Sequence, residues 1–592
     1  MGDFRGIIDK LDYIKSLGAT AIWLSPIHPA DSYHGYDVTD YTAVNPQYGT
    51  MADFEALVAA AHERGIKIYL DYVLNHTGKS HPWFVAANAS TDNEWRDYYI
   101  FSQNPAEDVR AGRIAMLSDR VYNASEWFDC PTSESETAVR RLKFTLKWGA
   151  QPTITVSESE MVDAANPDTS TAGAKYLYFG NGECLKFYDK GNSVYELNVD
   201  FRSSWGFLVR TSNTTWDGGT KYGAAASAGR LSLEKPFTLT ASSPVNVVPD
   251  WLELWKFHSN FYTEYMPDLN YGAIASFRDS PTYKAMVESA KGWIDRGVDG
   301  FRLDAVRHIY HDTRSAENPT FLDGFYTDLN DYFRLAHPDR TLYMVGEVFA
   351  EADEVAPYYA GLHALFEFSF WNRLSWAINN STGCYFVKDI LSYQPKYAQY
   401  RADCIEATKL SNHDEERTCT VLGGSTAKAK VAAAVLLTAG GEPYIYYGEE
   451  LGYVGSKQRG DEYVRVPMRW GDGYTTRFIT KQDAGMLSVP DVQRQSADGE
   501  SMLNVYRRFG ELRHTYRAMA TGTMERHPIY NENNTAVKSV AAWYRVEGDE
   551  RMLVLHNLSA ERVELTLDDD IDKCVAVLGR VERRVKEGRT NV

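Results

Sequence analysis

The chain has 592 residues, enough for roughly three or four domains at about 150 residues each. With 62 Lys and Arg against 80 Asp and Glu, its formal net charge is −18. This charge argues against a nucleic acid or an anionic membrane surface as the main partner, because both attract clustered positive charge. The six scattered cysteines form no CxxC pair, which argues against a zinc ribbon or a dense disulfide scaffold. No apolar run approaches the roughly 20 residues of a membrane span, and no charged-then-apolar leader follows Met1.

Short apolar runs alternate with amphipathic helical patterns over much of the chain. Such almost wholly apolar strands are typical of parallel sheets that are buried on both faces. Seven of them favour an α/β fold of the (β/α)8 TIM-barrel type over a doubly wound sheet. The predicted strands are Ala21–Pro26, Ile66–Val73, Val298–Ala305, Leu342–Val348, His363–Phe370, Thr408–His413 and Pro443–Tyr447.

The eighth strand of this barrel is not visible in the sequence. We interpret Met1–Ile7 as the end of a loop that leads into a helix at Ile8–Leu17. The first barrel strand is then expected upstream of Met1. A barrel without it would expose two unpaired strand edges, which is unfavourable.

More than 200 residues separate the strand ending at Val73 from the strand starting at Val298, far more than an ordinary loop. Residues 132–250 are rich in Ser, Thr, Gly and Asn, and Ser193–Phe201 alternates apolar and polar residues as a half-buried strand does. Further strands are predicted at Thr153–Val156, Lys175–Phe179, Phe207–Thr211 and Leu231–Thr240. We therefore predict an inserted all-β sandwich.

The sequence thus predicts four kinds of domain. The expected boundaries are 1–76 and 272–516 for the two parts of the barrel, 77–131 and 251–271 for the two parts of a smaller lobe, 132–250 for the sandwich, and 517–592 for a C-terminal antiparallel β domain.

Three acids follow predicted strands of the barrel, at the end where barrel enzymes place their sites. Asp304, Glu347 and Asp414 come at or after the ends of the strands starting at Val298, Leu342 and Thr408. Gathering three acids costs repulsion energy, so this arrangement favours a catalytic role over a structural one. Retaining glycoside cleavage needs an ionised nucleophile and a protonated acid, with carboxyl groups about 5–5.5 Å apart.

Arg302 lies two residues before Asp304 and so shares its face of the strand. We expect this guanidinium to lower the pKa of Asp304 and hold it ionised. We expect the two acidic neighbours of Glu347 to raise its pKa and keep it protonated. A purely structural ion pair between Arg302 and Asp304 is the alternative.

Seven short motifs resemble the α-amylase family of glycoside hydrolases. The chain is most similar to the cell-surface starch-utilisation amylase/neopullulanase type, in which a starch-binding module interrupts the smaller lobe. The motifs are DYVLNH (71–76), GFRLDAVRH (300–308), GEVF (346–349), SNHDEE (411–416), HGYDVTDY (34–41), MPDLN (266–270) and EPYIYYGEE (442–450).

The resemblance assigns a role to each matching residue. It implies that Asp304 is the nucleophile, Glu347 the general acid/base and Asp414 the stabiliser of the transition state. Arg302 would orient Asp304, and Asp71 would tie the end of its strand to its neighbours. The remaining residues that the resemblance places at the substrate are Tyr36, His76, His413 and Arg417.

The resemblance also implies bound Ca²⁺. Its ligands would be Asn75, Asp268 and the His308 carbonyl, all of which offer the oxygen atoms that calcium prefers. Asp3 is similar to the last acid of a second calcium loop found in many relatives. The alternative is that these polar residues brace the lobe without a metal.

Aromatic residues of the insert are candidates for starch binding. Trp205 and Trp216 would stack on sugar rings, with Lys221 as a polar partner; filling the sandwich core is the alternative for each ring. Tyr222 and Asn213 are further candidates. Trp376 and Tyr385 form an aromatic pair for which we favour core packing over a surface starch site.

Taken together, the motifs predict an endo-acting, retaining hydrolase of α-1,4 bonds in starch and maltooligosaccharides. Tyr33, where exo-acting relatives commonly carry Asp, and Ala305 favour internal cleavage. A pullulan-cleaving or transglycosylating enzyme of the same family remains open, as does a non-catalytic α-glucan-binding protein. By resemblance we expect a monomer outside the cell or at its surface, on the outer membrane, with other starch-binding proteins as further partners.

Overall fold

The computed structural model describes residues 2–118, 120–130, 139–179, 183–203, 205–214, 217–252, 255–311, 315–473, 488–531, 533–586 and 589–591. By its internal contacts the chain divides into two compact units. The first comprises Met1–Asn75, Ile274–Asp279 and Tyr283–Val592, and the second His76–Ala273 and Ser280–Thr282. None of the helices in the described ranges combines the length and the apolar character that crossing a bilayer requires.

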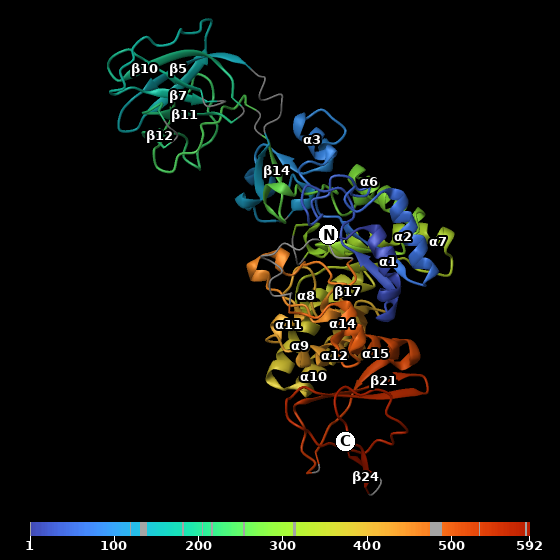
Figure 1. The fold of residues 1–592 in the computed structure, drawn as a ribbon. Coiled ribbons are helices and arrows are strands. Elements are labelled where there is room, and N and C mark those ends of the chain that lie inside the picture. Colours follow the sequence, from blue (N-terminus) through green and yellow to red (C-terminus); the bar gives the residue numbers. More distant parts are fainter. Residues whose placement is uncertain are drawn as a thin grey trace. The chain divides into compact units, whose positions relative to one another are not determined.

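The first unit is built around a curled sheet of parallel strands (Figure 1). The strands lie side by side in sequence order, and every neighbouring pair is parallel. Each of the seven predicted strands overlaps a strand of this sheet, but the bounds differ. β17 is shorter than expected because α9 begins at Phe368, β18 ends at Lys409 and leaves residues 410–413 of the predicted strand outside it, and β19 ends at Tyr444. The strands are β1 (Ala21–Leu24), β2 (Lys67–Val73), β15 (Gly300–Asp304), β16 (Tyr343–Gly346), β17 (Ala364–Glu367), β18 (Ile405–Lys409) and β19 (Glu442–Tyr444).

Helices follow or precede each strand, as the alternating pattern predicts. The second of them begins with a capping box, in which the Thr50 hydroxyl and the Asp53 carboxylate bind each other's backbone N–H. The helices of this unit are α1 (Phe4–Ser16), α2 (Met51–Glu63), α6 (Pro281–Asp295), α7 (Glu317–Ala336), α8 (Ala352–Val355), α9 (Phe368–Asn380), α10 (Gly383–Ala398), α11 (Thr418–Val421), α12 (Thr426–Thr438), α14 (Val492–Ala497), α15 (Met502–Thr515) and α16 (Arg517–Ala520).

The prediction for the first residues was wrong. Met1–Ile7 was expected to be a loop, but α1 begins at Phe4. The Asp3 carboxylate accepts a hydrogen bond of 2.6 Å from the Gly6 N–H, and Phe4 is buried with its ring 5.5 Å from that of Phe54. A capping Asp and one buried ring are therefore enough to start the helix a turn earlier than expected.

The outer strands β1 and β19 each pair on one side only, within the part of the chain that the structure describes. Trp23 of β1 and Tyr444 of β19 pack against a buried cluster that includes Phe366. An eighth strand of the barrel stays a prediction.

The second unit contains the predicted sandwich. A sheet of β13 (Phe237–Thr238), β6 (Thr153–Glu158), β5 (Arg140–Lys147), β10 (Val194–Phe201) and β9 (Tyr188–Asp189) contributes to the same buried core as a sheet of β12 (Lys221–Tyr222), β11 (Phe207–Arg210), β7 (Tyr176–Phe179) and β8 (Glu183–Lys186). The alternation seen in the sequence is confirmed, because Leu197, Val199 and Phe201 are buried. The predicted strand Leu231–Thr240 is mostly irregular and leaves only β13.

A separate three-stranded sheet of the second unit frames the insert. It consists of β3 (Phe101–Ser102), β14 (Trp255–His258) and β4 (Trp127–Cys130), and α3 (Pro82–Ala89) precedes it in the chain. Cys130 pairs with Trp255 in the antiparallel register of β4 and β14. The chain therefore leaves for the sandwich and returns from it at neighbouring points.

The predicted C-terminal antiparallel β region is also confirmed. One sheet consists of β20 (Thr523–Arg526), β21 (Val540–Glu547) and β22 (Glu550–Asn557), and a second of β23 (Thr566–Leu567), β25 (Arg589–Asn591) and β24 (Arg584–Lys586). A small apolar core with Ile529, Val540 and Leu565 holds this region together.

Candidate active site

One guanidinium lies at the centre of the acids that follow the parallel strands. Arg302 Nη1 is 2.7 Å from Asp304 Oδ1 and 2.9 Å from Asp71 Oδ1, and Nη2 is 2.8 Å from Glu347 Oε2. Arg302 pairs with Asp71 in the register of β15 and β2, so the two side chains project from the same level of the sheet. The structure therefore joins three carboxylates through one buried cation.

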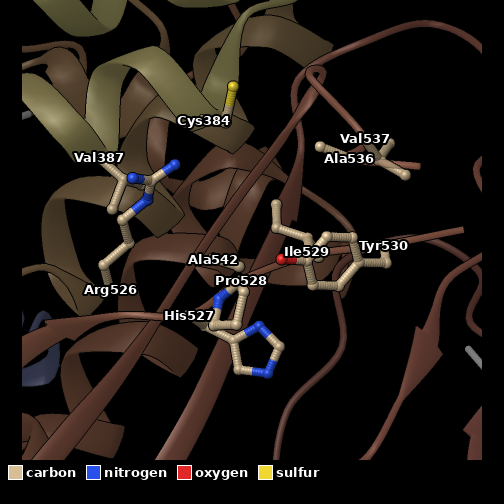
Figure 2. Close-up of a pocket in the computed structure, with 10 residues that line it drawn as sticks. All are labelled: Cys384, Val387, Arg526, His527, Pro528, Ile529, Tyr530, Ala536, Val537 and Ala542. Atoms are coloured by element: carbon tan, nitrogen blue, oxygen red, sulfur yellow. The ribbon is translucent and has the colours of Figure 1, made fainter. Parts of the chain in front are cut away.

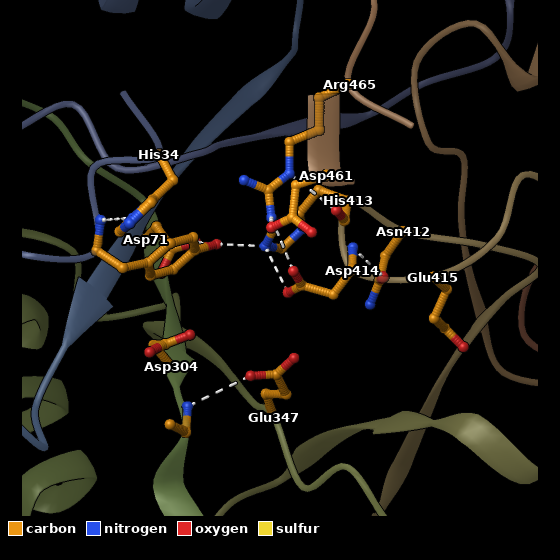
Figure 3. A network of polar contacts seen from close by, with 12 residues as sticks. His34, Asp71, Asp304, Glu347, Asn412, His413, Asp414, Glu415, Asp461 and Arg465 are labelled. Carbon is orange, nitrogen blue, oxygen red and sulfur yellow. Dashed lines mark hydrogen bonds and ion pairs between the residues drawn. The ribbon is translucent and has the colours of Figure 1, made fainter. Parts of the chain in front are cut away.

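The backbone after β15 turns sharply at the site. Ala305 adopts a left-handed conformation with φ of 48°, and its N–H lies 3.4 Å from Glu347 Oε2. A non-glycine residue in this region is strained and persists only where its surroundings hold it. Figure 3 shows the carboxyl groups of Asp304 and Glu347 at the ends of these adjacent segments.

An aromatic residue and a histidine extend the cluster towards the third acid. The Tyr36 hydroxyl donates to Asp71 Oδ2 at 2.9 Å and lies 2.6 Å from His413 Nε2. The two rings are nearly parallel, 8° apart, and His413 Nε2 is 3.0 Å from Asp414 Oδ2. Tyr36 and His413 thus connect Asp71, which pairs with Arg302, to Asp414. Figure 3 shows Asp71, His413 and Asp414 in this network.

The loop after β19 supplies two cations to Asp414. Arg465 Nη2 lies 2.8 Å and Lys457 Nζ 3.2 Å from Asp414 Oδ1, and both cations also pair with Asp461. Burial alone would raise the pKa of Asp414. Its hydrogen bond to His413 and the charges of His413, Lys457 and Arg465 outweigh burial and hold this pKa well below its usual range.

The acids around Arg302 behave in the opposite way. Burial raises the pKa of Asp71 to about 6 and that of Asp304 to about 7, although Arg302 lowers both. Burial also raises the pKa of Glu347, and the charges of Asp304 and Asp414 add to this effect. Burial therefore favours the retention of a proton by this group of three acids.

These shifts correct one expectation. Arg302 was expected to hold Asp304 ionised, but the pKa of Asp304 is raised because burial outweighs a guanidinium that also serves Asp71 and Glu347. For Glu347 the direction is as expected, but burial is the larger cause and the acidic neighbours the smaller.

Arg417 has a supporting position. Its side chain is fully buried, its Nη1 donates to the Tyr447 carbonyl at 2.6 Å, and its guanidinium lies 4.0 Å from the centre of the Tyr446 ring. With no exposed surface, Arg417 cannot contact a sugar in this conformation. We therefore withdraw the direct substrate contact predicted for it.

The predicted metal ligands are divided between the two units. Asn75 and His308 belong to the first, and Asp268 to the second, where it accepts from His258 Nδ1 at 2.6 Å and from the Asn260 N–H at 2.8 Å. Asp3 caps α1, as described above. His76, a predicted substrate contact, also belongs to the second unit, and its ring stacks 5.2 Å from that of Phe261.

In the insert, Trp205 is 42% exposed and Lys221 is partly exposed, whereas Trp216 lies outside the described residues. Tyr222 packs at the edge of the sandwich core, with its ring 4.8 Å from Trp148, which fits the core alternative. Asn213 is exposed. Elsewhere, core packing is wrong for Trp376 and Tyr385, which are 54% and 42% exposed.

Comparison with known proteins identifies the family. Residues 1–134 and 242–522 match the catalytic domain of alpha amylase. The chain belongs to the α-amylase family. Its insert, residues 137–250, matches the CBM58 domain of alpha-amylase SusG, and residues 540–588 match the SusG C-terminal domain.

Individual members of the α-amylase family resemble the chain over most of its length. It is 55% identical to alpha-amylase SusG of Bacteroides thetaiotaomicron, over 98% of this chain and 85% of that protein. It is 30% identical to alpha-amylase 3 of Dictyoglomus thermophilum, over 96% of this chain and 82% of that protein. The crystal structure of the α-amylase from H. orenii matches with a TM-score of 0.65 and 26% identity, over 100% of this chain and 92% of that one. These findings confirm the resemblance predicted from the motifs, and the protein is a glycoside hydrolase.

Lys457, Asp461 and Arg465 of this α-amylase-type site were missed by the sequence analysis. Their signal is the regular spacing of four residues between alternating charges. Such spacing usually indicates exposed ion pairs along a helix, so without the fold it does not point to Asp414.

Proposed function

We propose that the protein is an endo-acting, retaining amylase that cleaves α-1,4 bonds in starch and maltooligosaccharides. The observation that carries this proposal is the bridge of one guanidinium between Asp304 and Glu347, with Asp414 linked to both through Asp71, Tyr36 and His413. Two carboxyl groups on the two arms of one guanidinium lie close together, as the short separation in retaining enzymes requires. The names of the amylase relatives support the substrate.

In this proposal the two central acids divide the chemistry. The Asp304 carboxylate attacks the anomeric carbon, while Glu347 donates its proton to the leaving oxygen and later removes one from water. Arg302 holds both side chains and stabilises the negative charge of Asp304 once the shared proton rests on Glu347. The raised pKa of Glu347 suits a group that must carry a proton at neutral pH.

Asp414 plays a different part because its environment keeps it ionised. An ionised carboxylate accepts hydrogen bonds from the hydroxyl groups of the reacting sugar and favours positive charge on its ring. Tyr36 offers a ring for stacking, and His413 offers a nitrogen donor to a hydroxyl group. His76 is fully buried and offers no surface to a sugar in this conformation. The low pKa of Asp414 supports this division of roles.

Internal cleavage is supported by the residue three positions before Tyr36. Tyr33 is half-exposed, and its hydroxyl lies 3.4 Å from Arg465 Nη1. A neutral tyrosine here does not form the strong ion pair that an Asp would make with Arg465.

Cleavage of pullulan and transfer to a sugar acceptor remain outcomes of the experiment below. A non-catalytic protein would not need the strained cluster of acids.

The residues proposed for calcium fit that ion by their chemistry. Asn75, Asp268 and the His308 carbonyl would hold it through oxygen atoms, and the ion would supply charge to brace the loops that follow β2 and β15. We propose no step of the reaction through it. Asp3 is a weaker candidate for a second calcium site because it already caps α1.

We further propose that the insert binds starch through Trp205, Trp216 and Lys221, as the match to a CBM58 domain suggests. Exposed Trp376 and Tyr385 would add a surface starch site. By resemblance, the protein acts as a monomer at the cell surface, on the outer membrane, beside other starch-binding proteins.

The test compares the parent with Glu347→Gln on amylose, pullulan and maltotriose. We expect the parent to release short maltooligosaccharides from amylose, with the new chain ends initially in the α configuration by NMR. Loss of the acid should lower kcat at least about a thousandfold. Glu63→Gln, an exposed change on α2, is the matched control and should act like the parent. Intact amylose with the parent, or a fast Glu347→Gln enzyme, would refute the proposal.

A further inference from the structure

Asp71 belongs to the acids around Arg302, but the proposed mechanism gives it no chemical step. Its Oδ1 lies 2.9 Å and its Oδ2 3.0 Å from Arg302 Nη1. Oδ2 also accepts from the Tyr36 hydroxyl at 2.9 Å and from the indole N–H of Trp23 at 3.2 Å. The Asp71 side chain has no exposed surface. Donors from three residues therefore hold this buried carboxylate in place.

Trp23 contacts both members of the ion pair between Asp71 and Arg302. The edge of its ring donates to Asp71, and the centre of the ring lies 5.0 Å from the guanidinium carbon of Arg302. A cation above an aromatic face is attracted by the quadrupole of the ring. Because Trp23 pairs with Tyr69 in the parallel register of β1 and β2, the indole projects from the strand beside that of Asp71. One neutral side chain thus acts on a carboxylate and on its cation.

Aromatic packing fixes the orientation of the indole. The Trp23 ring lies 5.4 Å from that of Phe366 and 6.4 Å from that of Tyr444, and it packs against the buried cluster that includes Phe366. It also meets the His413 ring edge-on at 5.7 Å. A rotation of the indole would lose these contacts. Its N–H is therefore aimed at Asp71 without help from a bound substrate.

The indole N–H favours one charge state of Asp71. Burial and the charge of Glu347 raise the pKa of Asp71, whereas Arg302 and the Tyr36 hydroxyl lower it, and the charge of Asp71 acts in turn on Asp304. An indole N–H can only donate. An ionised carboxylate accepts such a bond more strongly than a protonated one. The Trp23 donor therefore adds to the influences that keep Asp71 ionised.

We propose that Trp23 is a positioning residue of the active site, whose N–H keeps Asp71 ionised and paired with Arg302, so that the proton of the group rests on Glu347. Trp23 acts through Asp71 and Arg302 and not on the sugar. It lies outside the seven motifs that led to the family. The inference rests on the proposed function, because it uses the roles given there to Asp304 and Glu347.

Two variants separate the hydrogen bond from the packing of the ring. Trp23→Phe keeps an aromatic ring and loses the donor, whereas Trp23→Gln loses the ring and keeps an N–H donor. The experiment measures kcat and KM on a soluble maltooligosaccharide such as maltoheptaose. At pH 7 we expect Trp23→Phe to lose at least about tenfold in kcat, the effect of one hydrogen bond to a charged group, and to keep the KM of the parent. Trp23→Gln should keep more of the parent kcat than Trp23→Phe does.

Two control variants change tyrosines that contact none of the acids. Tyr444 packs beside Trp23, and its hydroxyl donates to the Tyr343 hydroxyl at 3.0 Å. Tyr530 borders a pocket between α10 and the C-terminal β region (Figure 2). Tyr444→Phe and Tyr530→Phe should both keep kcat within about twofold of the parent.

The profile of kcat/KM against pH reports where the proton rests. In Trp23→Phe, a form with the proton on Asp71 competes with the active form, which has the same proton on Glu347. The two forms carry equal numbers of protons, so the loss should be constant on the plateau of the profile. It should shrink above the alkaline limb, because Asp71 is ionised there in both enzymes. A general disturbance of the fold would instead lower kcat/KM by one factor at every pH.

Three results would overturn the inference. They are a Trp23→Phe enzyme as fast as the parent, a Trp23→Gln enzyme slower than Trp23→Phe, and a loss of kcat/KM that does not depend on pH. If Trp23→Phe fails to fold, Trp23→Gln decides by itself, because activity near that of the parent supports the donor and a loss of about tenfold opposes it. Glu347→Gln tells the two proposals apart. A fast Glu347→Gln enzyme refutes the proposed function, whereas a slow one leaves the results for Trp23 to judge this inference alone.

Discussion

The number of positive charges beside each acid of the site influences whether that acid keeps a proton. Arg302 offers one positive charge to Asp71, Asp304 and Glu347, so the group is left with excess negative charge unless it takes up protons. Asp414 instead faces two cations, Lys457 and Arg465. The site therefore contains one region that retains a proton and one that repels it. This is the division that an acid-assisted cleavage needs.

Lys457 tests this argument at the residue scale. In Lys457→Met the pKa of Asp414 should rise, because one of the charges that lowers it is lost. The rise should appear in the titration of the Asp414 carboxyl group, followed by NMR, as a shift of about one pKa unit. The acid limb of the profile of kcat/KM against pH should stay in place, because the pKa of Asp304, about 7, is the higher of the two.

The control is Lys15→Met, which removes an exposed lysine near the end of α1 and should leave the titration of Asp414 in place. A titration of Asp414 that does not move in Lys457→Met would contradict the argument, because Arg465 and His413 alone would then hold Asp414 ionised.

At the scale of elements, the sequence predicted the strands of the barrel because each contains a short, mostly apolar run of the kind that parallel sheets bury. The central strand β15 is buried throughout, whereas β1 and β19 at the two edges are only partly buried. It predicted the three acids because they come at or after strand ends. It did not predict the start of α1, which depends on one cap and on packing against Phe54. It also missed Lys457, whose contact with Asp414 spans 43 residues and exists only once the loop after β19 is folded.

Leu231–Thr240 shows another limit of pattern reading. Its apolar residues predicted a strand, but Leu231 and Leu239 are buried while the backbone between them is largely irregular. Leu231 and Leu239 can be buried wherever the chain crosses the sandwich core, and their burial does not require the hydrogen bonds of a strand. Pairing with β6 is available only at Phe237–Thr238. Tertiary context therefore decided where the ladder ends.

The paired positions of Cys130 and Trp255 make the insert separable in a test. Deleting Thr132–Asp250 leaves Pro131 and Trp251–Leu254 to connect β4 and β14, which are neighbours. We expect the shortened protein to fold and to cleave short soluble maltooligosaccharides at a rate within about threefold of the parent, a difference of less than 1 kcal/mol. Its binding to insoluble starch should fall at least tenfold.

A pull-down with starch granules measures the binding, and release of reducing ends measures the activity. Trp205→Ala in the full chain should also weaken binding to starch granules, and the insert should keep its fold. If the deletion lowers binding and soluble activity equally, the insert shapes the catalytic site and is not a separate binding module.

At the scale of the whole molecule, the burial of Asp304 lowers the stability of the folded protein as the pH rises. The pKa of Asp304 is about 7 in the folded protein, above the value of about 4 for a free Asp. The folded state therefore binds this proton more tightly than the unfolded state does. Between these two pH values, each rise in pH takes stability away from the folded protein, and above pH 7 the full loss is present.

Asp304→Asn should therefore stabilise the protein in a pH-dependent way while abolishing cleavage. Near pH 4 the gap between the melting temperatures of the variant and the parent should be small, because the folded parent carries this proton and about half of the unfolded chains do. At pH 8 the variant should melt higher than the parent, since the roughly three pKa units between the unfolded and the folded state allow a gain of up to about 4 kcal/mol. Asp403→Asn, at a mostly exposed position, should follow the parent at every pH. Melting curves from pH 4 to 8 measure the gap, and a gap that stays constant or narrows as pH rises would contradict the raised pKa of Asp304.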